Sequence, residues 1–230
     1  RVRDLVSRMT VEEKIGQIGK LRAWPNYDCS GGTMTFRRGF AEELKEHPVG
    51  TVTGIFRCDP WTQRGWGRGL EPAYAAKSRN AFQRLAVEGT RLGIPILFVG
   101  EAAHGHMSLG APTFPTGLGL GSSFDKDLVF RVGRAIGEDC ARRGDSAAYA
   151  PILDVAHDPR WSRVEECFGE DPQLVSLLGE AETRGLLAVG TQPCLKHYIG
   201  GGWSEGGHNR GPVRLGGRDF FSYELRPFRR

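Results

Sequence analysis

The sequence lacks any long apolar run. Among its 230 residues, no stretch approaches the roughly 20 apolar residues that a transmembrane helix requires. It also does not open with the charged, then apolar, then small-residue pattern of a secretory leader. We therefore expect no membrane partner. Because the first residue is Arg rather than Met, removal of a leader peptide is left open. The sequence therefore does not distinguish between a cytoplasmic, a periplasmic and a secreted location.

The sequence has few cysteines, and no two of them have the close spacing of a paired motif. The five cysteines are odd in number and far apart, without the paired spacing of a zinc site or a disulfide framework. They are interpreted as scattered buried thiols, which lean weakly toward a reducing compartment. We expect no metal and no cofactor.

Concentrated charge of one sign is also missing. The net charge is only +4, and basic and acidic residues are mixed along the whole chain. This pattern is not the basic stripe that binds nucleic acid, so no nucleic-acid partner is expected. With 39% hydrophobic and 25% charged residues, the composition is that of a globular protein long enough for one large domain.

What is present is an alternation of helical and strand patterns. Thr10 and Glu13 have the spacing of a capping box, which predicts a helix starting after Thr10. Periodicity and terminal residues predict helices over 1–21 (a pair), 72–92, 125–143 and 171–190, and strands over 49–56, 94–99, 117–121, 147–153 and 192–199. Residues 24–38, 61–69 and 101–115 are expected to be loops.

Strands that alternate with helices of this length indicate parallel βα units, as in a doubly wound sheet or an eight-stranded barrel. Polar residues follow three of the strands, at Glu101, at 154–163, and at Lys196 with His197. That placement is typical of barrel enzymes, whose active sites lie at the carboxyl ends of the strands. No Gly-rich phosphate loop follows the first strand, which argues against a dinucleotide-binding fold.

The densest group of charges lies in residues 150–172, APILDVAHDPRWSRVEECFGEDP. This stretch resembles the signature of glycoside hydrolase family 3, the β-glucosidase and β-xylosidase family. Further matching segments occur in the family's order: RMTVEEKIGQI, GIPILFVGEAAHG, FPTGLGLGSSFD, LKHY and SEGGHN. The resemblance covers the whole chain and is weakest between Trp24 and Trp66.

The resemblance implies an α/β fold, the N-terminal part of a (β/α)8 TIM-type barrel. About five to six βα units fit within residues 1–230, where a complete barrel has eight. In the family, the nucleophilic Asp and the acid/base residue come later than the last residue here. We therefore expect no catalytic residue in this chain, which is interpreted as a fragment without activity of its own.

The resemblance assigns sugar binding to Glu101, Arg163, Lys196 and His197. Their four head groups are expected to converge on one pocket the size of a monosaccharide. Without the resemblance, Glu101 would be read as a solvated loop acid and the Lys-His pair as an ordinary dipeptide. Arg160 is interpreted as structural, pairing with Asp154 or Asp158, and Glu165, Glu166 and Glu170 are also interpreted as structural.

By this resemblance the parent enzyme is a retaining exo-β-glycosidase that removes single sugars from small oligosaccharides or from aryl and alkyl β-glycosides. Glucose and xylose are the leading sugars, and arabinose stays open. Glu101 stands where many members have Asp, which favours xylose because a longer side chain leaves less room for a hydroxymethyl group.

Two alternatives stay open. The chain could be a carbohydrate-binding remnant without catalysis. It could also be a metal-dependent barrel hydrolase, because His104 and His106 have the alternate spacing of metal ligands on an extended segment. The metal-dependent alternative is disfavoured, because such hydrolases carry the histidine pair at the end of the first strand. Here at least one predicted strand precedes the pair. The oligomeric state is not indicated by the sequence.

Overall fold

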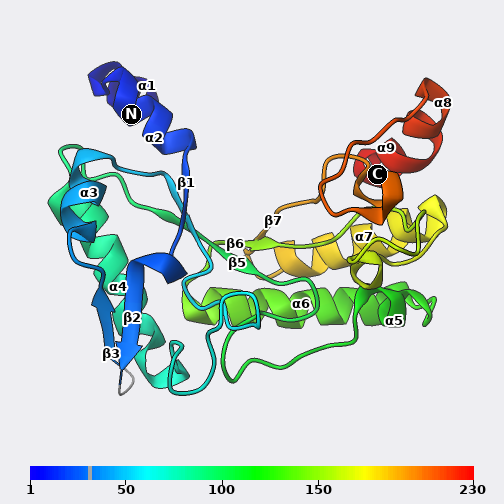
Figure 1. The fold of residues 1–230 in the computed structure, drawn as a ribbon, viewed down its shortest axis with the longest axis horizontal. Coiled ribbons are helices and arrows are strands. Elements are labelled where there is room, and N and C mark those ends of the chain that lie inside the picture. The colour runs from blue at the N-terminus through cyan, green and yellow to red at the C-terminus, as the bar shows by residue number, and fades with distance from the viewer. Residues whose placement is uncertain (31–32) are drawn as a thin grey trace. The chain divides into compact units, whose positions relative to one another are not determined.

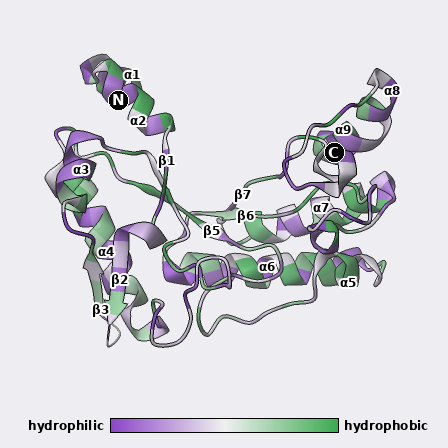
Figure 2. Ribbon diagram, in the orientation of Figure 1, coloured by the Kyte–Doolittle hydropathy of each residue, from purple (hydrophilic) through white to green (hydrophobic). Residues whose placement is uncertain are grey.

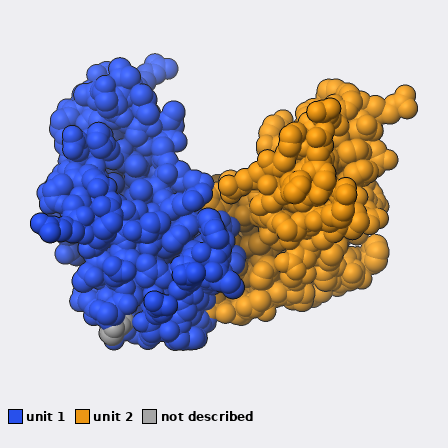
Figure 3. Space-filling model, in the orientation of Figure 1, with its two compact units in different colours: residues 1–101, 107–110, 143–146 blue, residues 102–106, 111–142, 147–230 orange. Residues whose placement is uncertain are grey.

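The structure is a computed structural model that describes residues 1–30 and 33–230. It divides into two compact units, coloured separately in Figure 3. Unit 1 comprises residues 1–101, 107–110 and 143–146, and unit 2 comprises residues 102–106, 111–142 and 147–230.

Two short helices begin unit 1, α1 (Val2–Arg8) and α2 (Val11–Ile18). The predicted capping box is confirmed: the backbone N–H of Glu13 donates to the Thr10 hydroxyl, and Glu13 accepts from the backbone N–H of Thr10. These two bonds satisfy donors that the first turn of a helix otherwise leaves unpaired. The predicted helix pair is therefore confirmed.

Three parallel strands run through unit 1: β1 (Lys20–Arg22), β4 (Thr51–Thr53) and β5 (Leu97–Glu101). β4 pairs with β1 on one side and with β5 on the other. The predicted strands at 49–56 and 94–99 are confirmed in part, with shorter or shifted bounds. β1 was not predicted, because three residues are too few to show an alternating pattern.

The prediction of a loop over 24–38 is wrong for most of its residues. A 3₁₀ turn, η1 (Trp24–Asn26), leads into an antiparallel pair, β2 (Tyr27–Ser30) and β3 (Thr33–Phe36). Residues 31–32 lie outside the described residues. The pair forms because its aromatic side chains pack against residues distant in sequence: the Phe36 ring lies 4.8 Å from that of Phe82, edge to face.

The helices α3 (Phe40–Glu46) and α4 (Pro72–Gly89) complete unit 1. They pack on each other, and β3 packs on α4 (Figure 1). The predicted helix over 72–92 is confirmed, with Pro72 in its first turn. Phe40 and Phe82 are both buried in the core that these elements share.

Unit 2 contains α5 (Gly117–Gly121), α6 (Lys126–Arg143), β6 (Ala147–Tyr149), α7 (Pro172–Leu187) and β7 (Gln192–Pro193). β6 and β7 are parallel. The predicted helices over 125–143 and 171–190 are confirmed, and Asp125 caps α6 by accepting from the backbone N–H groups of Asp127 and Leu128. The predicted strands over 147–153 and 192–199 are confirmed only for their first residues.

The prediction of a strand over 117–121 is wrong, because this segment is the helix α5. Its first and last glycines, Gly117 and Gly121, lie directly against the backbone of residues 166–168. A Cβ placed on Gly121 would lie 1.9 Å from the carbonyl oxygen of Phe168, and one on Gly117 would lie 2.1 Å from that of Glu166. A five-residue Gly-Leu alternation has no period that separates strand from helix, so tertiary packing decides its state.

The helices α6 and α7 form the main core of unit 2. Their contact is close because glycines face the partner helix: a Cβ on Gly133 would lie 2.6 Å from the carbonyl oxygen of Glu182. Along α6, green and purple segments alternate in Figure 2, as in an amphipathic helix with one buried face. The buried face includes Val129, Val132 and Ile136.

Short helical elements fill the remainder of unit 2. They are η2 (Val164–Glu166), η3 (Gly201–Trp203), η4 (Glu205–Gly207), α8 (Gly217–Asp219), the π-helix η5 (Phe220–Glu224) and α9 (Leu225–Arg229). The last of these, α9, packs on α7.

The predicted α/β class is confirmed. Five parallel strands alternate with helices along the described chain, three in unit 1 and two in unit 2. Since a complete barrel has eight such strands, the barrel is incomplete. Within the described residues, none of the helices combines the length and the hydropathy needed to span a membrane.

Candidate functional site

A buried carboxylate, Asp154, is the centre of the candidate site in unit 2. It follows β6 at the point where the chain pairs with the extension of β7: Ile152 and Lys196 form an isolated parallel bridge, and the N–H of Leu153 donates to the Lys196 carbonyl at 2.7 Å. The Asp154 side chain has no exposed area. Adjacent parallel segments thus bring Asp154 to the residues that follow Lys196.

Asp154 orients His197. Its Oδ2 accepts from the backbone N–H of His197 at 2.9 Å and lies 2.7 Å from the ring Nδ1. Because an ionised carboxylate only accepts hydrogen bonds, these contacts assign a proton to Nδ1 of the ring. The other ring nitrogen, Nε2, is then an acceptor.

Arg163 supplies the donor for that acceptor. Its Nη1 lies 2.7 Å from Nε2 of His197, so the guanidinium donates to the ring. Its other two nitrogens bind Glu166 in a bidentate pair, Nε to Oε1 at 2.8 Å and Nη2 to Oε2 at 2.6 Å. Asp154, His197, Arg163 and Glu166 therefore form one continuous chain of hydrogen bonds, in which every head group is fixed by a neighbour.

The charge balance of this chain favours an ionised Glu166. Burial alone would raise the pKa of Glu166, but the hydrogen bonds and positive charge of Arg163 outweigh it and hold the pKa below its usual value. Lys196 lowers the pKa of Glu166 further. The side chains of Arg163 and His197 remain 24% and 36% exposed, so both are accessible to a ligand.

Lys196 lies next to His197 and adds a second cation. Its Nζ is 5.3 Å from the centre of the Tyr149 ring, the distance of a cation–π contact. An ammonium group has three donors and a guanidinium has five, so Lys196 and Arg163 give this part of unit 2 donors for the acceptor groups of a ligand.

Glycine permits the tight packing under Asp154. The backbone N–H of Gly201 donates to Oδ1 of Asp154 at 3.1 Å. A Cβ on Gly201 would lie 2.5 Å from that oxygen and 3.3 Å from the buried Trp161 ring. Any other residue at Gly201 would push Asp154 or Trp161 out of place.

In unit 1, the candidate residue Glu101 ends β5 and is held by Arg57. Nη1 of Arg57 donates to Oε1 of Glu101 at 2.9 Å, and Nε of Arg57 donates to Oδ2 of Asp59 at 2.6 Å. All three side chains are mostly buried. Burial would raise the pKa of Asp59, but hydrogen bonds from Thr62 and Arg57 lower it overall.

The structure places the four predicted site residues as follows. Arg163, Lys196 and His197 lie together in unit 2, and Glu101 lies in unit 1. That all four line one pocket stays a prediction.

Of the two pairings expected for Arg160, the one with Asp158 is confirmed, but the expected burial of Arg160 is wrong. Arg160 pairs with Asp158 at 2.7 Å, and its side chain is 70% exposed rather than buried. Asp154, the other candidate partner, binds His197 instead. Three residues of the candidate site were missed as site partners: Asp154, Glu166 and Arg57. Their positions next to predicted strand ends were the available signal.

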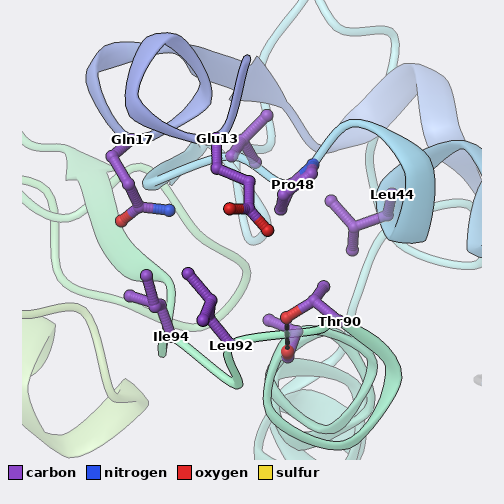
Figure 4. A pocket seen from close by; sticks show the side chains of 9 residues that line it. Glu13, Gln17, Leu44, Pro48, Thr90, Leu92 and Ile94 are labelled. Atoms are coloured by element: carbon purple, nitrogen blue, oxygen red, sulfur yellow. Dashed lines mark hydrogen bonds between the residues drawn. The ribbon is translucent and has the colours of Figure 1, made fainter. Parts of the chain in front are cut away.

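A small concavity in unit 1 is lined by residues of α2, of α3, and of the segments that follow α3 and α4 (Figure 4). Its interior is about 10 Å³, which is about the space of one water molecule. It is therefore too small for a sugar. His104 and His106 belong to unit 2, and in the described part of the chain no three His, Cys, Asp or Glu side chains are grouped as a metal would need.

Comparison with known proteins places these features in one family. Residues 10–230 match the model described as "Glycosyl hydrolase family 3 N terminal domain". The "Periplasmic beta-glucosidase" of Salmonella typhimurium is 29% identical over 99% of this chain and 27% of its own length. The "Putative beta-xylosidase" of Formosa agariphila is 30% identical over 99% of this chain and 30% of its own length. The chain thus spans less than a third of these two relatives.

Solved structures of β-glucan- and β-glucoside-cleaving enzymes also resemble this chain. The exo-1,3/1,4-beta-glucanase of a Pseudoalteromonas species superposes with a TM-score of 0.80 at 25% identity, over 99% of this chain and 28% of that one. The beta-glucosidase of Listeria innocua, solved in complex with glucose, gives a TM-score of 0.77 at 28% identity, over 99% of this chain and 30% of that one.

Proposed function

The chain belongs to glycosyl hydrolase family 3, and on that premise we propose that its full-length parent is a retaining exo-β-glycosidase. It releases single sugars from the non-reducing ends of small oligosaccharides or from aryl and alkyl β-glycosides. In this proposal the present chain contributes substrate binding. The two carboxyl groups that retention requires, a nucleophile and an acid/base, belong to the remainder of the parent.

The observation that carries the proposal is the hydrogen-bond chain from Asp154 through His197 and Arg163 to Glu166. Enzymes that break glycosidic bonds hold the sugar so that its anomeric carbon faces the nucleophile, and rigid donors provide that orientation. His197 and Arg163 are each fixed from behind by a carboxylate. Arg163 and Lys196 supply the donors, and His197, whose Nδ1–H binds Asp154, holds the Arg163 guanidinium through Nε2.

Glu101 supplies the complementary acceptor in this proposal. A carboxylate accepts from two adjacent sugar hydroxyls at once, and charged acceptors make stronger hydrogen bonds than neutral ones. Arg57 holds the Glu101 head group in one orientation. The proposal thus assigns sugar binding to Glu101 in unit 1 and to Arg163, Lys196 and His197 in unit 2.

Glucose and xylose are the two sugars proposed. Relatives with beta-glucosidase and beta-xylosidase names match this chain about equally well. We favour xylose, since Glu101 is one methylene longer than the Asp expected of glucosidases and leaves less room for a hydroxymethyl group. A steric difference of this size contributes about 1–3 kcal/mol to discrimination.

The test uses the purified full-length parent with aryl β-xyloside and aryl β-glucoside, and follows the anomeric form of the first product by NMR. We expect turnover with retention, and no measurable turnover by the 230-residue chain alone. Inversion, or robust turnover by the chain alone, would contradict the proposal. Glu101→Asp should shift the ratio of the two kcat/KM values toward the glucoside, and an unchanged ratio would show that Glu101 does not select the sugar.

A further inference from the structure

An exposed tryptophan, Trp61, lies near Glu101 in unit 1. It is 56% exposed, although it belongs to a segment whose neighbours are held by ion pairs. Single exposed apolar residues are common and need no explanation by themselves. Trp61 differs because its ring is fixed: it meets the Trp24 ring edge to face, with centroids 5.1 Å apart.

Trp24 is itself held by close packing on a glycine. Gly54 has a φ of 66°, in the left-handed region, and a Cβ at this position would lie 2.7 Å from Cζ3 of Trp24. Only glycine accepts that conformation and that contact without strain. The support under Trp61 is therefore rigid, so the exposed indole is presented in one orientation.

Arg57 connects this indole to the proposed sugar ligand Glu101. Its guanidinium carbon lies 4.5 Å from the centre of the Trp61 ring, and its Nη1 binds Glu101 at 2.9 Å. Arg22 lies 5.2 Å from the same ring. Since one guanidinium touches both groups, Trp61 and Glu101 are close enough to contact the same ligand. More than half of Trp61 remains open for it.

We propose that Trp61, Arg57 and Glu101 form a sugar subsite in which the Trp61 indole packs against the C–H face of the ring whose hydroxyls Glu101 accepts. A pyranose carries hydroxyls at its rim and apolar C–H groups on its faces. A carboxylate beside a flat, rigid aromatic surface is complementary to both. This inference rests on the proposed glycosidase function and adds a specificity-determining residue to it.

The experiment compares Trp61→Ala, Trp61→Phe and the control Trp66→Ala in the full-length parent. Trp66 is a second exposed indole, 67% exposed, five positions further along the same loop. The measurements are kcat and KM for aryl β-xyloside and aryl β-glucoside, and the inhibition constants of free xylose and glucose. Free sugars carry no aglycone, so their inhibition constants report the sugar subsite alone.

For Trp61→Ala we expect KM and the inhibition constant of the preferred sugar both to rise about tenfold, equivalent to about 1.4 kcal/mol. Loss of an interaction made equally with substrate and transition state raises KM and leaves kcat nearly unchanged. Trp61→Phe should restore most of the affinity, because a smaller aromatic face remains. Trp66→Ala should match the wild type.

Two results would overturn the inference while leaving the proposed function intact. If Trp61→Ala raises KM for aryl glycosides but not the inhibition constants of free sugars, the indole holds the aglycone instead. If Trp61→Ala changes neither while Glu101→Ala weakens both, Trp61 is no part of the subsite. Failure of the wild-type parent to cleave either glycoside would instead refute the proposed function itself.

Discussion

Replacing Asp154 by Asn tests whether the buried carboxylate acts through His197. In the wild type, Oδ2 accepts two hydrogen bonds from His197 and Oδ1 accepts one from Gly201. Asparagine has almost the same shape but offers one oxygen and one NH₂ group. Whichever way the amide is turned, its NH₂ group faces an N–H donor.

The two orientations of the amide differ in cost. If the NH₂ group faces Gly201, one hydrogen bond is lost and two donors meet. If it faces His197, the ring must move its proton from Nδ1 to Nε2, which then points a donor at Arg163, 2.7 Å away. The first orientation is cheaper, but in it a neutral amide oxygen replaces the carboxylate as the acceptor of both His197 hydrogen bonds. Both bonds weaken, because a hydrogen bond contributes about 1.5–3 kcal/mol with a charged group and about 0.5–1.5 kcal/mol between neutral groups. Because about 1.4 kcal/mol corresponds to a factor of ten, kcat/KM should fall by roughly 10- to 100-fold.

The assay is kcat/KM of the full-length parent on its preferred aryl glycoside, with Asp158→Asn as the matched control. Asp158 is a carboxylate on the same loop whose partner Arg160 is exposed. Exposed pairs of this kind contribute little, so the control should stay within about threefold of the wild type. A double variant, Asp154→Asn with His197→Ala, completes a mutant cycle.

If Asp154 acts through His197, the double variant should be scarcely worse than His197→Ala alone. The reasoning is refuted if Asp154→Asn retains wild-type kcat/KM. It is also refuted if the two substitutions multiply fully in the cycle, because Asp154 would then act independently of His197. Melting temperatures of the variants separate these outcomes from a general loss of fold.

Three further predictions concern stability and packing. Burial raises the pKa of the Glu182 carboxyl from 4.5 to about 8. On raising the pH, the unfolded state therefore loses this proton first, and the stability of the folded state falls between about pH 4.5 and 8. The melting temperature of Glu182→Gln should fall less steeply across that range, and a slope identical to that of the wild type would contradict the assignment. Gly201→Ala should lower kcat/KM at least as much as Asp154→Asn, since its Cβ would lie 2.5 Å from Oδ1 of Asp154; wild-type kinetics would show that the loop adjusts freely. Thr10→Ala should reduce stability by about 1 kcal/mol in denaturant titration by removing the α2 cap, and Thr10→Ser should retain most of it.

The sequence by itself determined the elements whose signals are local. The capping box of Thr10 and Glu13, and the helix that starts after Asp125, rest on residues within one helical turn. Ordered motifs also sufficed to identify the family and, through it, the candidate residues Glu101 and Arg163. Both kinds of signal can be read from the sequence, because neither the local capping pattern nor the order of the motifs depends on contacts between distant residues.

Only the tertiary structure decided the elements that depend on distant contacts. The β2–β3 pair forms against Phe82, and the Gly-Leu segment 117–121 becomes helical where its glycines meet the backbone of residues 166–168. A local pattern is ambiguous in both cases, because short segments carry too few residues to show a period.

The same separation holds for the candidate site. Motifs pointed to His197, but its partner Asp154 lies 43 positions earlier, and Arg57 lies 44 positions before Glu101. Asp154 was one of the two expected partners of Arg160, and nothing in the linear sequence distinguishes that pairing from binding His197. The parallel pairing of Ile152 with Lys196 determines the partner of Asp154, because its register brings the Asp154 carboxylate to the His197 ring.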